Sequence, residues 1–139
     1  ILLASFLLDL VKKEPEMFLS KLGNKNFTLV TKLLDLQAKS QKVIAQNIAN
    51  VNTPNYKRRE FRFEKALHQA LGTGEASSYR DVTGWVARPN NTAVRNNGNN
   101  VDVEAEMMSM KETEMLYEIY TQVYNKKSTL VKKAINGGS

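Results

Sequence analysis

The chain has 139 residues, of which 42% are hydrophobic, and its formal net charge is +6. This length suits one domain with a modest hydrophobic core. Because cysteine is absent and His68 is the only histidine, the sequence excludes disulfides, thiolate metal sites and a histidine-based catalytic triad. The acid pairs Glu104 with Glu106 and Glu112 with Glu114 are spaced by two, so on a helix they point to different sides. No phosphate-binding loop or nucleophile motif appears either, and we predict a protein that is not an enzyme and uses no cofactor, metal or small-molecule substrate.

The positive charge is concentrated in the first half of the chain. Residues 1–71 carry 12 basic and 6 acidic groups, whereas residues 101–139 carry 5 and 6. Such a field could serve nucleic acid, an anionic membrane surface or an acidic neighbouring subunit. The only dense basic cluster is Lys57-Arg58-Arg59, and the adjacent Tyr56 and Phe61 suggest base stacking only faintly. A solvated turn or a salt-bridging interface is the favoured interpretation of the cluster.

The first eight residues are apolar but too short to cross a membrane, which takes about 20 apolar residues. A secretory signal is not indicated, because the basic start and the small-residue cleavage site are missing. Since the chain begins with Ile1, Met17 is a plausible original start. We expect residues 1–19 to be a leader, or sequence wrongly placed upstream of the true start.

The region 20–57 is predicted to form the first long helix and its end. Eight positions from 27 to 51 alternate steps of three and four, and six of them are apolar, which indicates a helical seam. Asn26 is a reasonable N-cap for this helix. The seam fits ordinary core packing or a coiled-coil-like surface completed by a second helix. Its apolar members are Phe27, Val30, Leu34, Ile44, Ile48 and Val51.

An asparagine-rich run ends this helix at residues 46–57. Its four asparagines offer carboxamides that both donate and accept hydrogen bonds. Pro54 forbids further helix, and proline followed by asparagine predicts a type II turn over residues 53–56. We take the following residues as a candidate assembly motif: Asn47, Ile48, Ala49, Asn50, Val51, Asn52, Thr53, Pro54, Asn55 and Tyr56.

The middle region, 58–100, shows weaker patterns. Residues 63–71 predict a short amphipathic helix ended by Gly72 and Gly74. Residues 79–88, with Tyr79 and Trp85 among them, predict a short strand or hairpin. The asparagine-rich stretch that follows is predicted to be loop, and its lack of apolar residues makes it mobile unless a partner orders it.

A second long helix is predicted from about residue 102 to residue 135, within a C-terminal region 101–136. Acidic residues occupy its first turns and lysines its last turns, which matches the helix macrodipole. Two long terminal helices predict a mainly α fold, in which they pair as a coiled-coil-like hairpin with a short helix and an irregular or small β segment between them. The packing residues expected on the second helix are Met115, Leu116, Ile119, Val123, Leu130 and Ala134.

The run at 46–57 resembles the signature of the bacterial flagellar rod and hook axial proteins, in which an Ala-Asn-Val-Asn-Thr-Pro-Gly-Tyr-like sequence closes the N-terminal helix. Asn55 stands where the family usually has glycine, a replacement that asparagine allows because it tolerates positive φ. Residues 96–107 resemble the entry to the C-terminal helix of proximal-rod subunits, and residues 63–67 and 116–135 resemble other parts of those subunits.

This resemblance implies a structural subunit of the proximal rod in the basal body, exported by the flagellar type III apparatus and assembled helically across the periplasm. The implied partners are the axial proteins FlgC, FlgF, FlgG and FliE, further copies of the chain, the export gate and the membrane ring. The motif at 47–56 would then contact neighbouring subunits. The alternatives are a proximal-rod subunit of the FlgC type and, less favoured, a basic helical adaptor that binds nucleic acid or an anionic surface.

Overall fold

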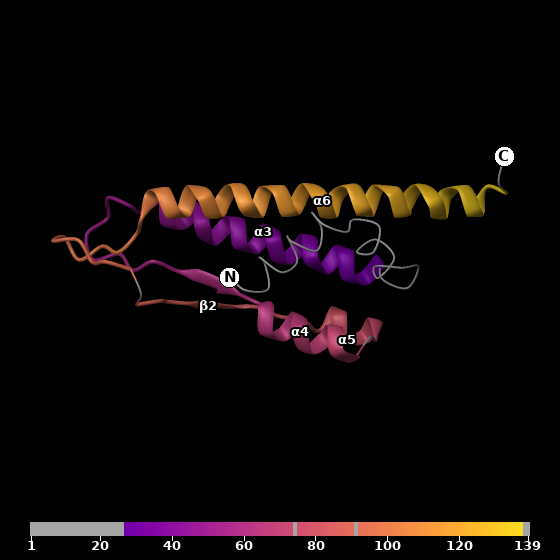
Figure 1. Cartoon of the computed structure of the whole chain (residues 1–139), viewed down its shortest axis with the longest axis horizontal. Coiled ribbons are helices and arrows are strands. Elements are labelled where there is room, and N and C mark those ends of the chain that lie inside the picture. The colour runs from indigo at the N-terminus through magenta and orange to yellow at the C-terminus, as the bar shows by residue number, and fades with distance from the viewer. Residues whose placement is uncertain (1–26, 74, 91, 138–139) are drawn as a thin grey trace.

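The computed structural model describes residues 27–73, 75–90 and 92–137. Two long helices, α3 (Phe27–Ala49) and α6 (Val103–Ile135), lie side by side and run in opposite directions (Figure 1). Phe27 at the start of α3 stacks on Tyr124 of α6, and the far end of α3 contacts the beginning of α6. The predicted mainly α architecture with paired terminal helices is confirmed. The expected leader at 1–19 and the N-cap Asn26 lie outside the described residues.

The buried face of α3 is wider than a single seam. Of its expected packing residues, Val30 and Ile44 are buried, Leu34 and Ile48 are half-buried, and Phe27 is exposed, contrary to expectation. The buried face is wide because α3 packs against α6 along one side and against α5 and β1 along another. The apolar residues buried on α3 are Leu29, Val30, Leu33, Leu36, Val43 and Ile44.

α6 begins with a side-chain cap and ends beyond the described part of α3. The Asp102 carboxylate accepts hydrogen bonds from the backbone N–H groups of Glu104, at 3.0 Å, and Ala105, at 3.2 Å, as an N-cap residue does. Leu116 and Val123 are buried. Ile119, by contrast, is half-buried.

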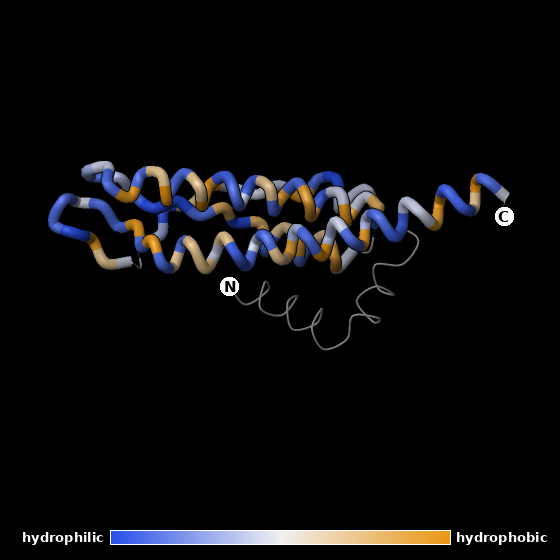
Figure 2. The backbone as a smooth tube through the Cα atoms, turned by 90° about the horizontal axis from the view of Figure 1, so that it is seen from above, coloured by the Kyte–Doolittle hydropathy of each residue, from blue (hydrophilic) through white to orange (hydrophobic). Residues whose placement is uncertain are grey.

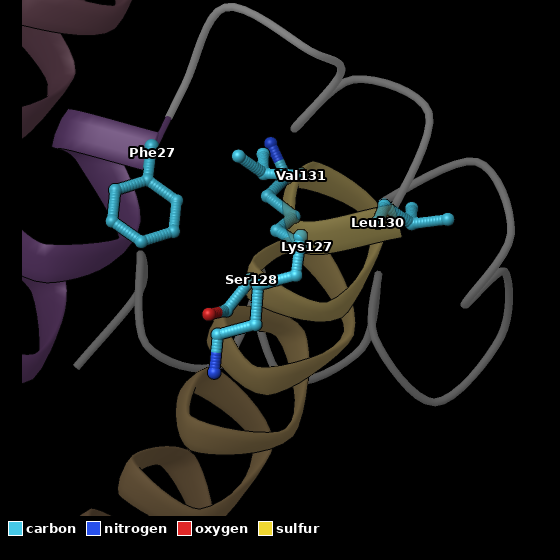
Figure 3. Close-up of a pocket in the computed structure, with 6 residues that line it drawn as sticks. Phe27, Lys127, Ser128, Leu130 and Val131 are labelled. Atoms are coloured by element: carbon cyan, nitrogen blue, oxygen red, sulfur yellow. The ribbon is translucent and has the colours of Figure 1, made fainter. Parts of the chain in front are cut away.

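Three residues expected to pack on α6 are exposed instead, namely Met115, Leu130 and Ala134. Met115 lies one position from the buried Leu116 and is turned outward. Leu130 and Ala134 belong to the last turns of α6. Figure 2 shows that the C-terminal end of the long helix projects past the other described elements. Near this projection, Phe27 faces residues of α6 across a surface pocket of about 420 Å³ (Figure 3).

Four short elements lie in the middle of the described part of the chain. The predicted helix is confirmed as α4 (Glu64–Thr73), although it continues through Gly72 instead of ending there. The prediction of a strand over 79–88 holds only for β2 (Trp85–Ala87), because the preceding residues form α5 (Ala76–Arg80). β2 pairs antiparallel with β1 (Glu60–Arg62), placing Glu60 opposite Ala87 and Arg62 opposite Trp85.

One core joins these elements to the helical hairpin. Tyr79 and Val82 are buried beside Phe63 and Leu67, and this group packs on α3 together with the inner side chains of α6. Burial raises the pKa of Tyr120 in this core to about 12, although a hydrogen bond from Gln37 opposes the shift. The short elements therefore cover one side of α3. The two asparagine-rich segments, residues 46–57 (the first segment) and 96–100 (the second segment), lie at the end of the hairpin.

Candidate assembly site at the two asparagine-rich segments

Asn47 lies on the last turns of α3 with its side chain fully buried. Its Nδ2 donates to the backbone oxygen of Arg59, at 2.7 Å, and to Oε2 of Glu106, at 3.0 Å. Its Oδ1 accepts from the backbone N–H of Arg59, at 3.0 Å, and from the hydroxyl of Tyr56, at 3.2 Å. These four bonds use both hydrogens and both lone pairs of the carboxamide, so Asn47 ties the end of α3 to β1 and α6.

The predicted turn is present immediately after α3. The backbone N–H of Tyr56 donates to the oxygen of Thr53 at 3.3 Å, and Asn55 has φ 59°, the positive φ that a type II turn requires at this position. The turn is held against the second asparagine-rich segment, because the N–H of Asn55 donates to the oxygen of Asn97 at 2.9 Å. The two segments approach so closely at Gly98 that an added Cβ would lie 2.3 Å from Oδ1 of Asn55.

Asn99 caps the end of α3 from the second segment. Its Nδ2 contacts three backbone oxygens, those of Asn50 at 2.9 Å, Val51 at 3.1 Å and Thr53 at 2.9 Å. Its Oδ1 accepts from the N–H of Val101 at 2.8 Å. The three backbone oxygens lie just after the end of α3, so this fully buried carboxamide holds the turn that follows the helix.

Asn100 makes the next connection between the segments. Its Oδ1 accepts from the backbone N–H of Arg58 at 2.6 Å, and its Nδ2 donates to the hydroxyl of Thr92 at 2.9 Å. Lys57 adds a further link, because its ammonium group donates to the oxygen of Gly98 at 2.6 Å. The basic cluster at 57–59 is therefore largely engaged within the chain.

A buried ion pair completes the network. Glu106, on the first turns of α6, has no exposed side-chain surface and pairs with the guanidinium of Arg58, which is 17% exposed. Arg58 also contacts Glu60, which pairs in turn with Arg62 at 3.1 Å. Removing one partner of such a buried pair costs more than the pair contributes, because it leaves an uncompensated charge.

Only some residues of the predicted assembly motif are exposed. Asn47 is buried, and Asn50 is half-buried with its carboxamide bonded to Gln46 and Thr53. The side chains of Asn52 and Asn55 are exposed and form no hydrogen bond among the described residues. The remaining members fall between these cases: Ile48, Val51 and Tyr56 are half-buried, and Ala49, Thr53 and Pro54 are exposed.

Sequence reasoning missed the partners of this motif. Asn99 and Asn100 belong to a stretch that we expected to be a mobile loop, but both side chains are buried. Arg58 was interpreted only as part of a basic cluster, and Glu106 only as one of the acidic residues that suit a helix N-terminus. A signal in the sequence could have indicated these partners. One asparagine-rich run follows the first long helix and another precedes the second, so antiparallel pairing of the helices brings the two runs together.

Other kinds of site are not indicated in the described parts of the chain. Among these residues, no group of three or more His, Asp or Glu side chains could hold a metal ion. No helix within 27–73, 75–90 and 92–137 combines the length and apolarity needed to cross a membrane.

Comparison with known proteins shows which family the chain resembles. A family model described as flagella basal body rod protein matches residues 34–57, which include the asparagine-rich turn. The chain is 35% identical over 107 residues to the flagellar basal body rod protein FlgB of Bacillus subtilis, covering 70% of this chain and 83% of the relative. It is 31% identical over 113 residues to FlgB of Borrelia hermsii, covering 68% and 84%. It is 30% identical over 125 residues to FlgB of Aeromonas hydrophila, covering 82% and 95%. The chain therefore belongs to the FlgB family of flagellar basal body rod proteins.

Proposed function

We propose that the protein is a subunit of the proximal part of the rod, exported by the flagellar type III apparatus and assembled helically across the periplasm. Membership of the FlgB family makes it a structural component of the basal body rod rather than an enzyme. The relatives named above are FlgB proteins, which favours this type of subunit over the FlgC type. Family membership also argues against the alternative of a basic adaptor that binds nucleic acid.

The protein assembles into the rod with other axial proteins, and we propose FlgC, FlgF, FlgG and FliE as the specific ones. Further copies of the chain, the export gate and the membrane ring complete the proposed set of contacts. The chain contains no cysteine, which suits a protein that works in an oxidising compartment.

The assembly proposal rests on a difference between the asparagines of the turn: some form hydrogen bonds within the chain, and others are exposed. Asn47 and Asn50 are bonded within the chain, whereas the exposed side chains of Asn52 and Asn55 are left for a partner. Because Asn99 and the backbone of Asn97 fix the turn before any partner binds, ordering the turn adds little entropic cost to assembly. We assign residues 52–55 as the surface that contacts a neighbouring subunit.

The test is a double variant that changes only this surface. Asn52→Ala combined with Asn55→Gly removes two carboxamides and keeps a residue suited to positive φ. Asn90→Ala, which alters an exposed loop asparagine elsewhere, is the matched control. We expect the double variant to be folded and exported but to give few complete rods by electron microscopy and little swimming. Normal rods in the double variant would contradict the assignment, and loss of export would indicate a targeting role instead.

A further inference from the structure

An open groove of about 520 Å³ runs between α3, β1 and α6. Its apolar lining includes Val43 and Ile44 from α3 and Leu116 from α6. Its charged lining consists of Arg58, Arg59, Glu60, Arg62, Glu64 and Glu112. The groove is large enough for a bulky side chain, and its mixed lining suits one that has both an apolar body and a polar group.

One residue of the groove lining has a buried polar atom that lacks a hydrogen-bond partner among the described residues. Gln37 lines the groove, its residue is only 4% exposed, and its Oε1 accepts no hydrogen bond from any described residue. Its amide is already used toward Tyr120. A buried acceptor without a donor is unfavourable, so the chemistry of this groove suits an occupant that combines an apolar body with one N–H.

Trp85 has that chemistry and lies on the surface. It is 51% exposed on β2, the outer strand of a two-stranded sheet, and the adjacent Val86 is 52% exposed. An indole ring provides a large apolar area and a single N–H donor. Tryptophan is also the residue type most enriched at the energetic centres of protein interfaces.

The charges beside the two surfaces are complementary. Arg88 follows Trp85 closely, is exposed and forms no ion pair with the described residues. Glu112 of the groove lining is likewise exposed and has no ion-pair partner among them. Opposite charges that meet at the rim of an interface favour one orientation of the partner.

We infer that Trp85 of one copy inserts into the groove of a second copy, where its N–H donates to Oε1 of Gln37 and Arg88 approaches Glu112. This inference rests on the proposed function as a rod subunit and names one contact within it. In the proposed arrangement the second copy does not return its own Trp85 to the first, so the contact is heterologous and leaves a free groove at one end and a free Trp85 at the other. Repeated contacts of this kind build an open assembly instead of closing into a dimer.

Cysteine cross-linking tests the contact, because the chain has no cysteine of its own. Arg88→Cys in one copy and Glu112→Cys in a second, size-tagged copy are produced together in flagellated cells, and basal bodies are isolated and oxidised. We expect a cross-linked pair of the two chains. The matched control pairs Arg88→Cys with Lys39→Cys, an exposed position of α3 outside the groove, and should give no cross-link.

Additional variants show whether the indole is responsible. Adding Trp85→Ala to the Arg88→Cys chain should abolish the cross-link, and Trp85→Phe, which lacks the N–H, should reduce its yield several-fold. If both chains are present in basal bodies with no cross-link, or if the cross-link persists with Trp85→Ala, the contact is refuted while the proposed function stands. Absence of both the wild-type chain and the cysteine variants from basal bodies would refute the proposed function itself.

Discussion

Replacing Asn47 with alanine removes the side chain that joins the end of α3 to β1 and α6. Four hydrogen bonds disappear, two at the backbone of Arg59, one at Glu106 and one at Tyr56. The alanine offers no replacement donor or acceptor. The Arg59 N–H and C=O then lose their partner, and the buried Glu106 keeps only Arg58.

The expected loss of stability follows from the number of groups left without a partner. A buried polar group without a hydrogen bond costs about 1–3 kcal/mol, and water that enters the vacated space offsets part of this. We therefore expect Asn47→Ala to lower the free energy of unfolding by about 3–4 kcal/mol, a large part of the roughly 5–15 kcal/mol typical of a domain. Asn52→Ala, at an exposed position, should change it by less than about 0.5 kcal/mol.

Urea unfolding followed by far-UV circular dichroism measures both values. A second comparison isolates the contact with Glu106. Asn47→Asp places another carboxylate beside that buried group, and adding Glu106→Gln should recover part of the loss. The reasoning is refuted if Asn47→Ala is as stable as Asn52→Ala, or if Glu106→Gln makes Asn47→Asp worse.

Three further predictions concern other parts of the molecule. Gly84→Ala should destabilise the chain by about 1–3 kcal/mol in urea unfolding, because its Cβ would lie 2.3 Å from Cζ of Phe61. Gly72→Ala, in α4 with open space around it, should be neutral or stabilising in the same assay. The pKa of Tyr120 is raised from 10.0 to about 12 in the folded state. Its protonated hydroxyl therefore contributes fully to the free energy of unfolding below pH 10, and this contribution is lost as the pH rises toward 12. Between pH 9 and 11 the loss should be about 1–1.5 kcal/mol, and Tyr120→Phe should lack it. In the purified protein, amide exchange should be faster at residues 128–135 than in the middle of α6, and equal protection would contradict the exposure described for that end.

The features that sequence predicted well depend on local chemistry. The turn at 53–56 follows from proline and asparagine at adjacent positions, and Asn55 adopts the required positive φ. The start of α6 follows from Asp102, whose carboxylate caps the helix. Pairing of the two long helices was also predictable, because each carries an apolar stripe that a partner must cover.

The features that sequence did not predict depend on contacts between distant segments. Tyr79 was expected in a strand, but the core formed with α3 and α4 accommodates it on the short helix α5. The strand that pairs with β2 lies before α4, a pairing that no local pattern reveals.

The asparagine-rich stretch offers the clearest case. Composition correctly predicts a loop there, but it does not predict that Asn99 and Asn100 are buried, because their partners are backbone groups of a distant part of the chain. Leu130 and Ala134 were expected to pack because they continue the apolar stripe of α6, but they are exposed, since α6 extends past Phe27, the first described residue of α3.

The central claim, that the protein is a structural subunit of the rod, is tested most directly by electron microscopy of basal bodies from a strain that lacks its gene. The account predicts basal bodies with the membrane ring present and the rod absent, and recovery of the rod when the gene is restored. Complete rods in the deletion strain would contradict it.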